Sequence, residues 1–142
     1  MWDAGRTMSR ENVEIVRRVY DAVARRDAET VRALYDPEVE WDTSRLASEG
    51  MGTGLYRGLS GIRTFLRQWN EAWEDSSFDL EELIEAGEEV VSVVTRKGRG
   101  RASGIEVQAP GAVVWTIRGG KIVRVVLFPT RAEALKAAGL SE

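Results

Sequence analysis

The side chains that could carry chemistry in this chain are carboxylates, hydroxyls, guanidiniums and aromatic rings, because its 142 residues include no His and no Cys. Without Cys, disulfide bonds, thiolate catalysis and thiolate-bound metals are excluded. Without His, the commonest general base and metal ligand is missing. We therefore predict no metal site and no cofactor, and any acid–base chemistry would fall to Asp, Glu or Tyr.

Acidic residues are unevenly distributed along the chain. No Asp occurs after Asp79, and the later Glu residues Glu88, Glu89 and Glu106 lie at predicted turns or at a strand end. Carboxylates at such positions are usually solvated. The C-terminal half therefore offers no evident buried acid.

Basic residues cluster near a glycine-rich segment, at Arg96, Lys97, Arg99 and Arg101. A nucleic-acid site would need interleaved aromatic residues or a matching basic face, and a phosphate loop would need a helix directly after the glycines. The sequence has neither, and its net charge is only −3. We expect these bases to balance the acidic run over residues 81–89, with no nucleic-acid partner.

Apolar residues at helical spacing predict the helices that would position these groups. Ser9 is a good N-cap for a first helix that continues to about Arg26. Asp27 would cap a second helix that ends before Pro37, because proline pushes the preceding residue out of the α region. Residues 1–8 are expected to form a disordered leader, and residues 9–142 one domain.

Two more helices are predicted further along the chain. Ser60 would cap the third, and the last would be short and span Arg131–Gly139. The apolar stripe of the third helix is the strongest in the chain. It consists of Ile62, Phe65, Leu66, Trp69 and Trp73.

Alternation of polar and apolar residues predicts a short strand over residues 38–42 at a sheet edge, with Val39 and Trp41 facing inward. The following segment, residues 43–59, contains four glycines and is either an ordered lid or a disordered surface loop. Four strands then form a meander. They cover Phe78–Ala86, Val90–Lys97, Ile105–Arg118 and Lys121–Pro129.

The segment Ala112–Phe128 reads as a hairpin of two apolar strands turning at Gly119-Gly120. Because neither strand alternates with polar residues, both faces should be covered. The helices of the first half can cover one face, and the other would then be a ligand cavity or a subunit interface. If Val123, Val125 and Leu127 face a cavity, Arg124 faces the other side with Ile122, Val126 and Phe128. With the opposite alternation, Arg124 would point inward and could bind an anionic ligand.

Four segments in this order resemble the SnoaL-like family, which belongs to the superfamily of nuclear transport factor 2 and the ketosteroid isomerases. They are residues 11–20 (ENVEIVRRVY), 35–41 (YDPEVEW), 56–58 (YRG) and 115–123 (WTIRGGKIV), within a match over about residues 8–139. The resemblance implies an α+β fold in which a curved antiparallel sheet forms a cone around the N-terminal helices, as in cystatin-like α+β barrels. It also implies an apolar pocket on the concave face and a convex face available for a homodimer.

The resemblance implies which side chains line the pocket. Aromatic residues at helical spacing are more often core than ligand platform, but the inner face of the third helix looks into the pocket in this fold. The expected lining is Trp41, Tyr56, Phe65, Trp69, Trp73, Val113, Trp115 and Leu127. The expected dimer interface is Arg124, Val126 and Phe128.

Comparison with the ketosteroid isomerases assigns candidate catalytic roles. Asp42 is the carboxylate nearest the position of the general base, although a gapless match places Thr43 there, and Tyr20 is one residue from the position of the donor tyrosine. Where those enzymes carry a protonated aspartate on a late strand, this chain has Val113, which neither donates nor ionises. The alternatives are that Asp42 is a solvated strand-end carboxylate and that Tyr20 packs its ring in the core.

The expected function is binding of a small hydrophobic molecule in an apolar pocket, without a full ketosteroid-isomerase catalytic set. One alternative is an isomerase, polyketide cyclase or epoxide hydrolase that uses Asp42 as general base and Tyr20 as hydrogen-bond donor. The other is a non-catalytic dimeric interaction module. Whether the protein is an enzyme stays open. No stretch of eighteen apolar residues occurs, so we expect a cytoplasmic protein without a membrane partner.

Overall fold

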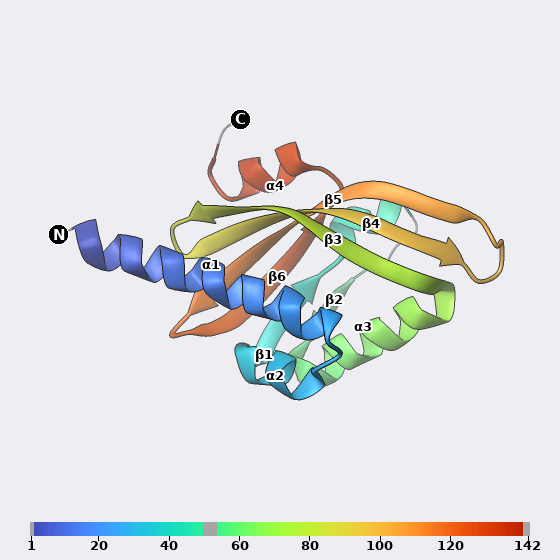
Figure 1. The fold of residues 1–142 in the computed structure, drawn as a ribbon, viewed down its shortest axis with the longest axis horizontal. Coiled ribbons are helices and arrows are strands. Elements are labelled where there is room, and N and C mark those ends of the chain that lie inside the picture. Colours follow the sequence, from blue (N-terminus) through green and yellow to red (C-terminus); the bar gives the residue numbers. More distant parts are fainter. Residues whose placement is uncertain (1, 50–53, 141–142) are drawn as a thin grey trace.

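The computed structural model describes residues 2–49 and 54–140. One six-stranded, curved and unclosed sheet carries α1, α2 and α3 toward one face and α4 on the other, which is an α+β architecture (Figure 1). The helices are α1 (Trp2–Ala24), α2 (Ala28–Leu34), the 3-10 helix η1 (Ser44–Glu49), α3 (Gly58–Ala72) and α4 (Arg131–Ala137). The strands are β1 (Tyr35–Asp42), β2 (Leu55–Arg57), β3 (Trp73–Ala86), β4 (Glu89–Gly100), β5 (Glu106–Arg118) and β6 (Lys121–Phe128).

The strand order in the sheet is β2-β1-β6-β5-β4-β3. All neighbouring strands are antiparallel except β1 and β6, which are parallel. The predicted edge position of residues 38–42 is wrong, because residues 55–57 form β2 and pair with the outer side of β1. Part of the segment expected to be a loop or lid is therefore a strand of the sheet.

The first helix begins at Trp2, seven residues before the predicted N-cap Ser9. Residues 2–8 are thus part of α1, and Met1 lies outside the described residues. These residues contain no proline, and extending a nucleated helix fixes one residue for each hydrogen bond gained. Extension of the helix toward the N-terminus was therefore more favourable than a helix start at the predicted N-cap Ser9.

The second helix has the N-cap that its sequence predicts, and the last helix is capped by Thr130, which the sequence analysis did not name. Asp27 accepts a hydrogen bond from the backbone N–H of Thr30 at 3.1 Å, and the Thr130 side chain accepts from the N–H of Glu133 at 3.2 Å. The third helix ends one residue earlier than its apolar stripe suggests. Trp73 is extended, with φ −128° and ψ 144°, and it is the first residue of β3.

The concave face of the sheet, against α1, α2 and α3, holds the larger hydrophobic core. Its buried residues are Val16, Val19, Leu34, Tyr35, Val39, Ile62, Val90, Trp115, Ile117, Ile122 and Val125. As predicted, Val39 and Trp41 face this core. Val125 and Leu127 of β6 face it as well.

The convex face is covered by α4 near one end of the sheet. Ala134 and Leu135 of α4 pack with Val126 and Phe128 of β6 and with residues of β4 and β5. Val126 and Phe128 are 5% and 6% exposed within this single chain, so these two side chains do not form the exposed dimer surface expected of them. Arg124 is exposed. The chain's own last helix supplies the second cover.

A β-bulge sets the orientation of β6. Thr116 pairs with Arg124 and Ile117 with Ile122, so Val123 is an extra residue without a counterpart on β5. A bulge of one residue reverses the side-chain alternation beyond it. Ile122 therefore joins the concave core, contrary to its expected place on the convex side with Arg124.

Candidate functional site

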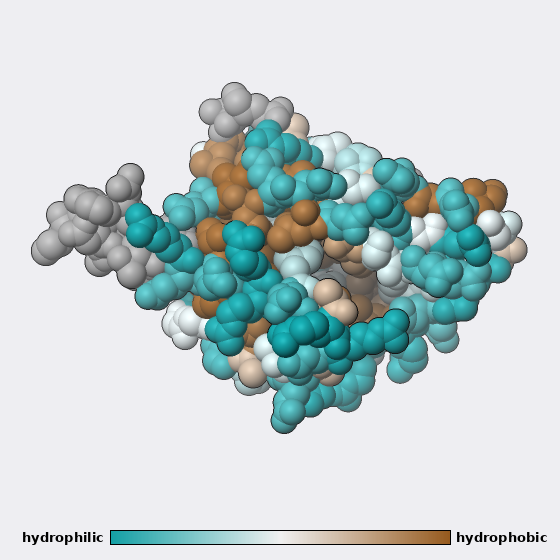
Figure 2. Space-filling view, viewed as in Figure 1, coloured by the Kyte–Doolittle hydropathy of each residue, from teal (hydrophilic) through white to brown (hydrophobic). Residues whose placement is uncertain are grey.

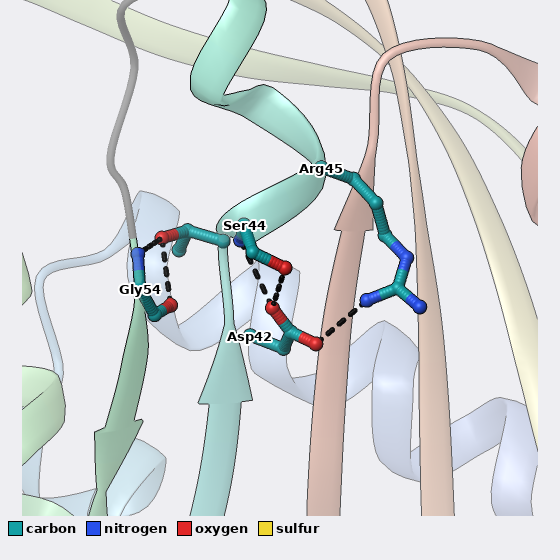
Figure 3. Close-up of polar contacts among 5 residues, drawn as sticks. Asp42, Ser44, Arg45 and Gly54 are labelled. Atoms are coloured by element: carbon teal, nitrogen blue, oxygen red, sulfur yellow. Dashed lines mark hydrogen bonds and ion pairs between the residues drawn. The ribbon is translucent and has the colours of Figure 1, made fainter.

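Asp42 ends β1 and binds the first turn of η1 (Figure 3). Its Oδ1 accepts from the Ser44 backbone N–H at 2.9 Å and from the Ser44 hydroxyl at 2.6 Å, and its Oδ2 accepts from Arg45 Nη1 at 2.7 Å. Asp42 is the register partner of Val126, so both side chains lie on the convex face. The carboxylate thus points away from the concave core.

Two opposing effects act on the Asp42 carboxyl. Partial burial raises its pKa, but the hydrogen bonds from Ser44 and the charge of Arg45 together lower it further, so the net pKa lies below the ordinary value. A general base at neutral pH works best with a pKa near 7. Asp42 is therefore a weak base held in a structural contact.

Thr43 occupies the position that a gapless match assigns to the general base. It is fully buried, its hydroxyl donates to the Gly54 carbonyl at 3.0 Å, and the same oxygen accepts from the Gly54 N–H at 3.2 Å (Figure 3). A threonine does not ionise in this range, and here its hydroxyl connects the end of β1 to the residue before β2. Within segment 43–59, residues 44–49 form η1, residues 55–57 form β2 and residues 58–59 begin α3, while residues 50–53 lie outside the described residues.

Tyr20 belongs to a buried polar group with Ser92 and Trp115. The Ser92 hydroxyl accepts from Trp115 Nε1 at 2.8 Å and is hydrogen-bonded to the Tyr20 hydroxyl at 2.8 Å. The Tyr20 and Trp115 rings meet edge to face, with centroids 5.8 Å apart. Sequence reasoning missed Ser92, whose signal was a single polar residue within the apolar run Val90–Val94.

Burial raises the pKa of Tyr20 to about 12, against a smaller lowering by the hydrogen bond to Ser92. The phenol is therefore protonated at neutral pH and suits a hydrogen-bond donor. It lies on the concave face, whereas Asp42 lies on the convex face. The two candidate catalytic residues are not brought together around one space, and Val113 packs against the concave core between other apolar side chains.

Aromatic side chains form a continuous row along the concave side. Ring centroids are 5.3 Å apart for Trp41 and Phe65, 5.3 Å for Tyr56 and Phe65, 5.9 Å for Phe65 and Trp69, and 5.9 Å for Trp69 and Trp73. The resemblance named all five as pocket residues. Trp41 and Phe65 lie inside the packed row, and Trp41 Nε1 is a buried donor for which the described residues offer no hydrogen-bond partner.

A cavity of about 260 Å³ opens at the end of this row, between the last turn of α3 and strands β3, β4 and β5. It is lined by Trp69, Trp73, Arg96, Lys97, Gly98, Val107 and Ala109. Of the predicted lining, Trp69 and Trp73 are present, while Trp115 and Leu127 belong to the packed core. The space-filling view also shows a hollow to the right of the C-terminal end of α1 (Figure 2).

The basic cluster divides between the two faces of the sheet. Lys97 pairs with Asp79 at 2.7 Å, Arg99 with Glu106 at 2.6 Å and Arg101 with Glu74 at 3.5 Å. These bases are thus paired with carboxylates, but the three partners lie outside the acidic run over residues 81–89 that was expected to balance them. Arg96 is different, because it is 7% exposed and lines the cavity. Its alternation with Ser92, Val94 and Gly98 on β4 was the signal that could have identified it.

The contacts of Asp42 make a prediction about acid stability. Because its pKa is lower in the folded chain, the carboxylate stabilises the fold above its unfolded pKa of about 3.9, and this contribution is lost as pH falls through the folded value. We expect the free energy of unfolding of Asp42→Asn to be roughly 1 kcal/mol lower than that of the parent at pH 7. Between pH 7 and pH 3, the free energy of unfolding should fall less in the variant than in the parent. Urea unfolding at both pH values measures this.

The matched control is Asp79→Asn, which removes a carboxylate from the exposed pair with Lys97. It should cost less at pH 7 than Asp42→Asn, because exposed ion pairs contribute little. Identical pH profiles for Asp42→Asn and the parent would contradict the role of Asp42 at the start of η1.

Two classes of site find no support in the described residues. Residues 2–49 and 54–140 contain no group of three or more Asp or Glu side chains arranged to hold a metal ion. In the same ranges, no helix has both the length and the apolar composition needed to cross a membrane.

Comparison with known proteins places this geometry among relatives. A sequence model described as the SnoaL-like domain matches residues 16–125. An NTF2-like protein of unknown function from Burkholderia pseudomallei is 27% identical, with 89% of this chain and 95% of that chain covered and a TM-score of 0.74. For an NTF2-like protein from Burkholderia thailandensis, the identity is 29%, the coverage 87% and 96%, and the TM-score 0.74.

A third solved structure is TerC co-crystallised with polyporic acid. It is 25% identical, the alignment covers 91% of this chain and 98% of that chain, and the TM-score is 0.73. A search among curated proteins found no match.

Proposed function

Because this chain belongs to the SnoaL-like family, whose domain model matches residues 16–125, we propose that it binds a small aromatic or otherwise hydrophobic molecule in the cavity beside α3. The observation that carries the proposal is the pair of tryptophans at the cavity wall. Trp69 and Trp73 are stacked at an interplanar angle of 30°, and both line the space. Flat aromatic walls favour flat ligands.

The size of the cavity supports a small ligand. Its volume of about 260 Å³ is just below the roughly 300–1,000 Å³ of typical ligand pockets. Val107 and Ala109 add apolar surface from β5. TerC, which was crystallised with polyporic acid, is a neighbour at 25% identity and supports a ring-containing ligand for this chain as well.

Catalysis by Asp42 and Tyr20 has less support. The two residues lie on opposite faces of the sheet, and the carboxylate is engaged by Ser44 and Arg45. Among the described residues, the Tyr20 phenol is hydrogen-bonded to the Ser92 hydroxyl, which is not a base, and this arrangement fits binding better than proton transfer. A non-catalytic binding protein therefore accounts for the described geometry without requiring Asp42 and Tyr20 to act on one ligand.

Titration of the intrinsic tryptophan fluorescence tests the proposal, using a panel of steroids, polyketides and terpenoids together with polyporic acid. We expect saturable quenching by at least one planar compound. The variant Ala109→Leu fills the cavity and should weaken that binding about tenfold or more, since steric exclusion removes the contacts of the ligand.

The matched control is Gln108→Leu, which introduces the same side chain one residue away on the opposite, exposed face of β5. It should bind like the parent. Quenching that is absent across the panel, or that Ala109→Leu leaves unchanged, would contradict the proposed cavity.

A further inference from the structure

Strand β3 has a bulge near its start, where Asp75 and Ser76 together lie opposite the single residue Gly98 of β4. Asp75 has a φ of 53°, in the left-handed region that residues other than glycine rarely adopt. Backbone conformations of this kind are strained, and they cluster at binding sites and active sites. The bulge therefore draws attention to this end of β3, which borders the cavity through Trp73.

The bulge changes which side chains share a face of the sheet. In a regular strand, Trp73 and Ser76 would face opposite sides, because they are three residues apart. The extra residue reverses the alternation, so both side chains lie over Gly98 on the concave side. An added Cβ at Gly98 would lie 3.3 Å from Trp73 Cε3 and 3.5 Å from Ser76 Cβ. The missing side chain of Gly98 thus lets both approach β4 closely.

Ser76 is the hydrogen-bond partner of a residue that lines the cavity. Its Oγ accepts from Trp69 Nε1 at 3.1 Å. Because an indole has one donor and no acceptor, this bond decides which edge of the ring faces β3. The Trp69 ring also contacts Phe65, Trp73 and Phe78, with centroids 5.9, 5.9 and 5.7 Å away. Ring contacts tolerate a range of angles, so the hydrogen bond adds the directional contact that fixes one orientation.

The orientation of Trp69 determines the shape of the cavity wall. With the hydrogen bond in place, the Trp69 and Trp73 rings are stacked at 30°, and both line the cavity. A wall that is fixed before binding favours a rigid ligand of matching shape, since less conformational freedom is lost. A flat fused-ring molecule can lie on indole faces, whereas a puckered molecule of the same size touches fewer ring atoms. Among the described residues, Ser76 does not itself line this space.

From these contacts we propose that Ser76 is a positioning residue, which makes the cavity selective for flat fused-ring ligands by holding the Trp69 indole in the orientation that stacks on Trp73. The bulge at Asp75 brings the Ser76 hydroxyl to this place. The inference rests on the proposed function, because it concerns the class of ligand that the same cavity takes.

Calorimetric titration with 2-naphthol and trans-decahydro-2-naphthol tests the selectivity. The two compounds share one carbon skeleton and one hydroxyl, but only 2-naphthol is flat. We expect the parent protein to bind 2-naphthol about tenfold more tightly, which corresponds to about one favourable aromatic pair.

Variants then test whether Ser76 is the source of the preference. Ser76→Ala removes the acceptor of the Trp69 indole. It should reduce the preference to about threefold or less, while the affinity for the decahydro compound changes by less than about twofold. Ser76→Thr keeps the hydroxyl and should retain the preference. If Ser76→Ala proves poorly folded by circular dichroism, Ser76→Cys takes its place, because sulfur is a weaker acceptor.

The matched control is Ser77→Ala, the same substitution at the next residue, whose side chain is exposed. It should bind both compounds like the parent. A role of Ser76 in stability alone would not change the ratio of the two affinities.

Nuclear magnetic resonance reports on the Trp69 indole directly. Each of the five tryptophans gives one indole N–H peak, and the peak that is missing in Trp69→Phe identifies Trp69. We expect this peak to shift in Ser76→Ala, because its proton loses the hydrogen bond to Oγ. Ser77→Ala should leave the peak in place.

The outcomes separate this inference from the proposal on which it rests. Equal affinity of the parent for the two compounds would overturn the selectivity and leave the binding function standing. An unmoved Trp69 peak, an unchanged preference in Ser76→Ala, or a preference lost equally in Ser76→Thr would overturn the role of Ser76. Binding of neither compound by the parent would overturn the inference, and with a silent fluorescence panel it would overturn the binding function too.

Discussion

Replacement of Ser92 by alanine is expected to lower the free energy of unfolding by about 2–5 kcal/mol. Ser92 is 0% exposed, and its hydroxyl is the hydrogen-bond partner of both Tyr20 and Trp115. Alanine nearly preserves the volume of serine, so the loss comes from leaving a buried phenol and a buried indole N–H without a partner. Urea unfolding at neutral pH measures it.

A double-mutant cycle distinguishes this cause from a general weakening of β4. Tyr20→Phe removes one of the two groups that Ser92→Ala would leave without a hydrogen-bond partner. The loss in free energy of unfolding caused by Ser92→Ala should therefore be smaller in the Tyr20→Phe background than in the parent, by at least about 1 kcal/mol. Thr95→Ala is the control on the same strand, because Thr95 bonds Glu81 on the exposed face. It should cost no more than about 1 kcal/mol.

Additive single losses, or a Ser92→Ala loss no larger than that of Thr95→Ala, would show that the hydroxyl is not the centre of this group. Confirmation would give Tyr20 a structural role in orienting Trp115 against α1.

The second large effect is expected for Trp69→Ala, in both stability and binding. The centroid of the Trp69 ring lies 5.9 Å from those of Phe65 and Trp73 and 5.7 Å from that of Phe78, so Trp69 connects the aromatic row to the cavity. Because the Trp69 side chain is only partly buried, we expect the free energy of unfolding to fall by about 2–3 kcal/mol. This is near or below the smallest losses seen when a core tryptophan is replaced by alanine. Ligand-dependent quenching should be lost together with the cavity wall.

Two further variants separate packing from ligand contact. Trp69→Phe keeps a ring in the row and should recover most of the stability while still weakening the binding of planar compounds. Leu66→Ala, on the same helix at a position 47% exposed, should change stability by about 0.5 kcal/mol or less. Unchanged binding in Trp69→Ala would remove this residue from the site.

Local pattern was enough to predict most of the secondary structure. The cap at Asp27, the last helix after Thr130 and the turn at Gly119-Gly120, where φ is 57° and 78°, agree with the sequence because each depends on a few neighbouring residues. The errors lie where local signals compete. Ser9 was overridden by helix continuation, and Trp73 left the helical stripe to start β3.

The candidate site was less predictable, since it depends on which face each side chain takes. The alternation that put Asp42 opposite Trp41 was correct, but only the pairing of Asp42 with Val126 shows that its face is the one covered by α4. The sequence analysis grouped Arg96 with its charged neighbours because they are close in sequence. Successive residues of a strand face opposite sides of the sheet, so Arg96 and Lys97 lie on different faces. Its pairing with Ala109 across the strands brings it to the cavity.

By itself, the sequence determined the α+β fold and excluded His and Cys chemistry, because composition and periodicity can be read directly along the chain. The family followed from the resemblance of four segments. Only the tertiary structure decided that a bulge at Val123 turns Ile122 inward, that α4 covers Val126 and Phe128, and that Asp42 and Tyr20 face apart. These outcomes depend on long-range strand register. A shift of one residue in register moves a side chain to the other face of a sheet, and no local pattern specifies it.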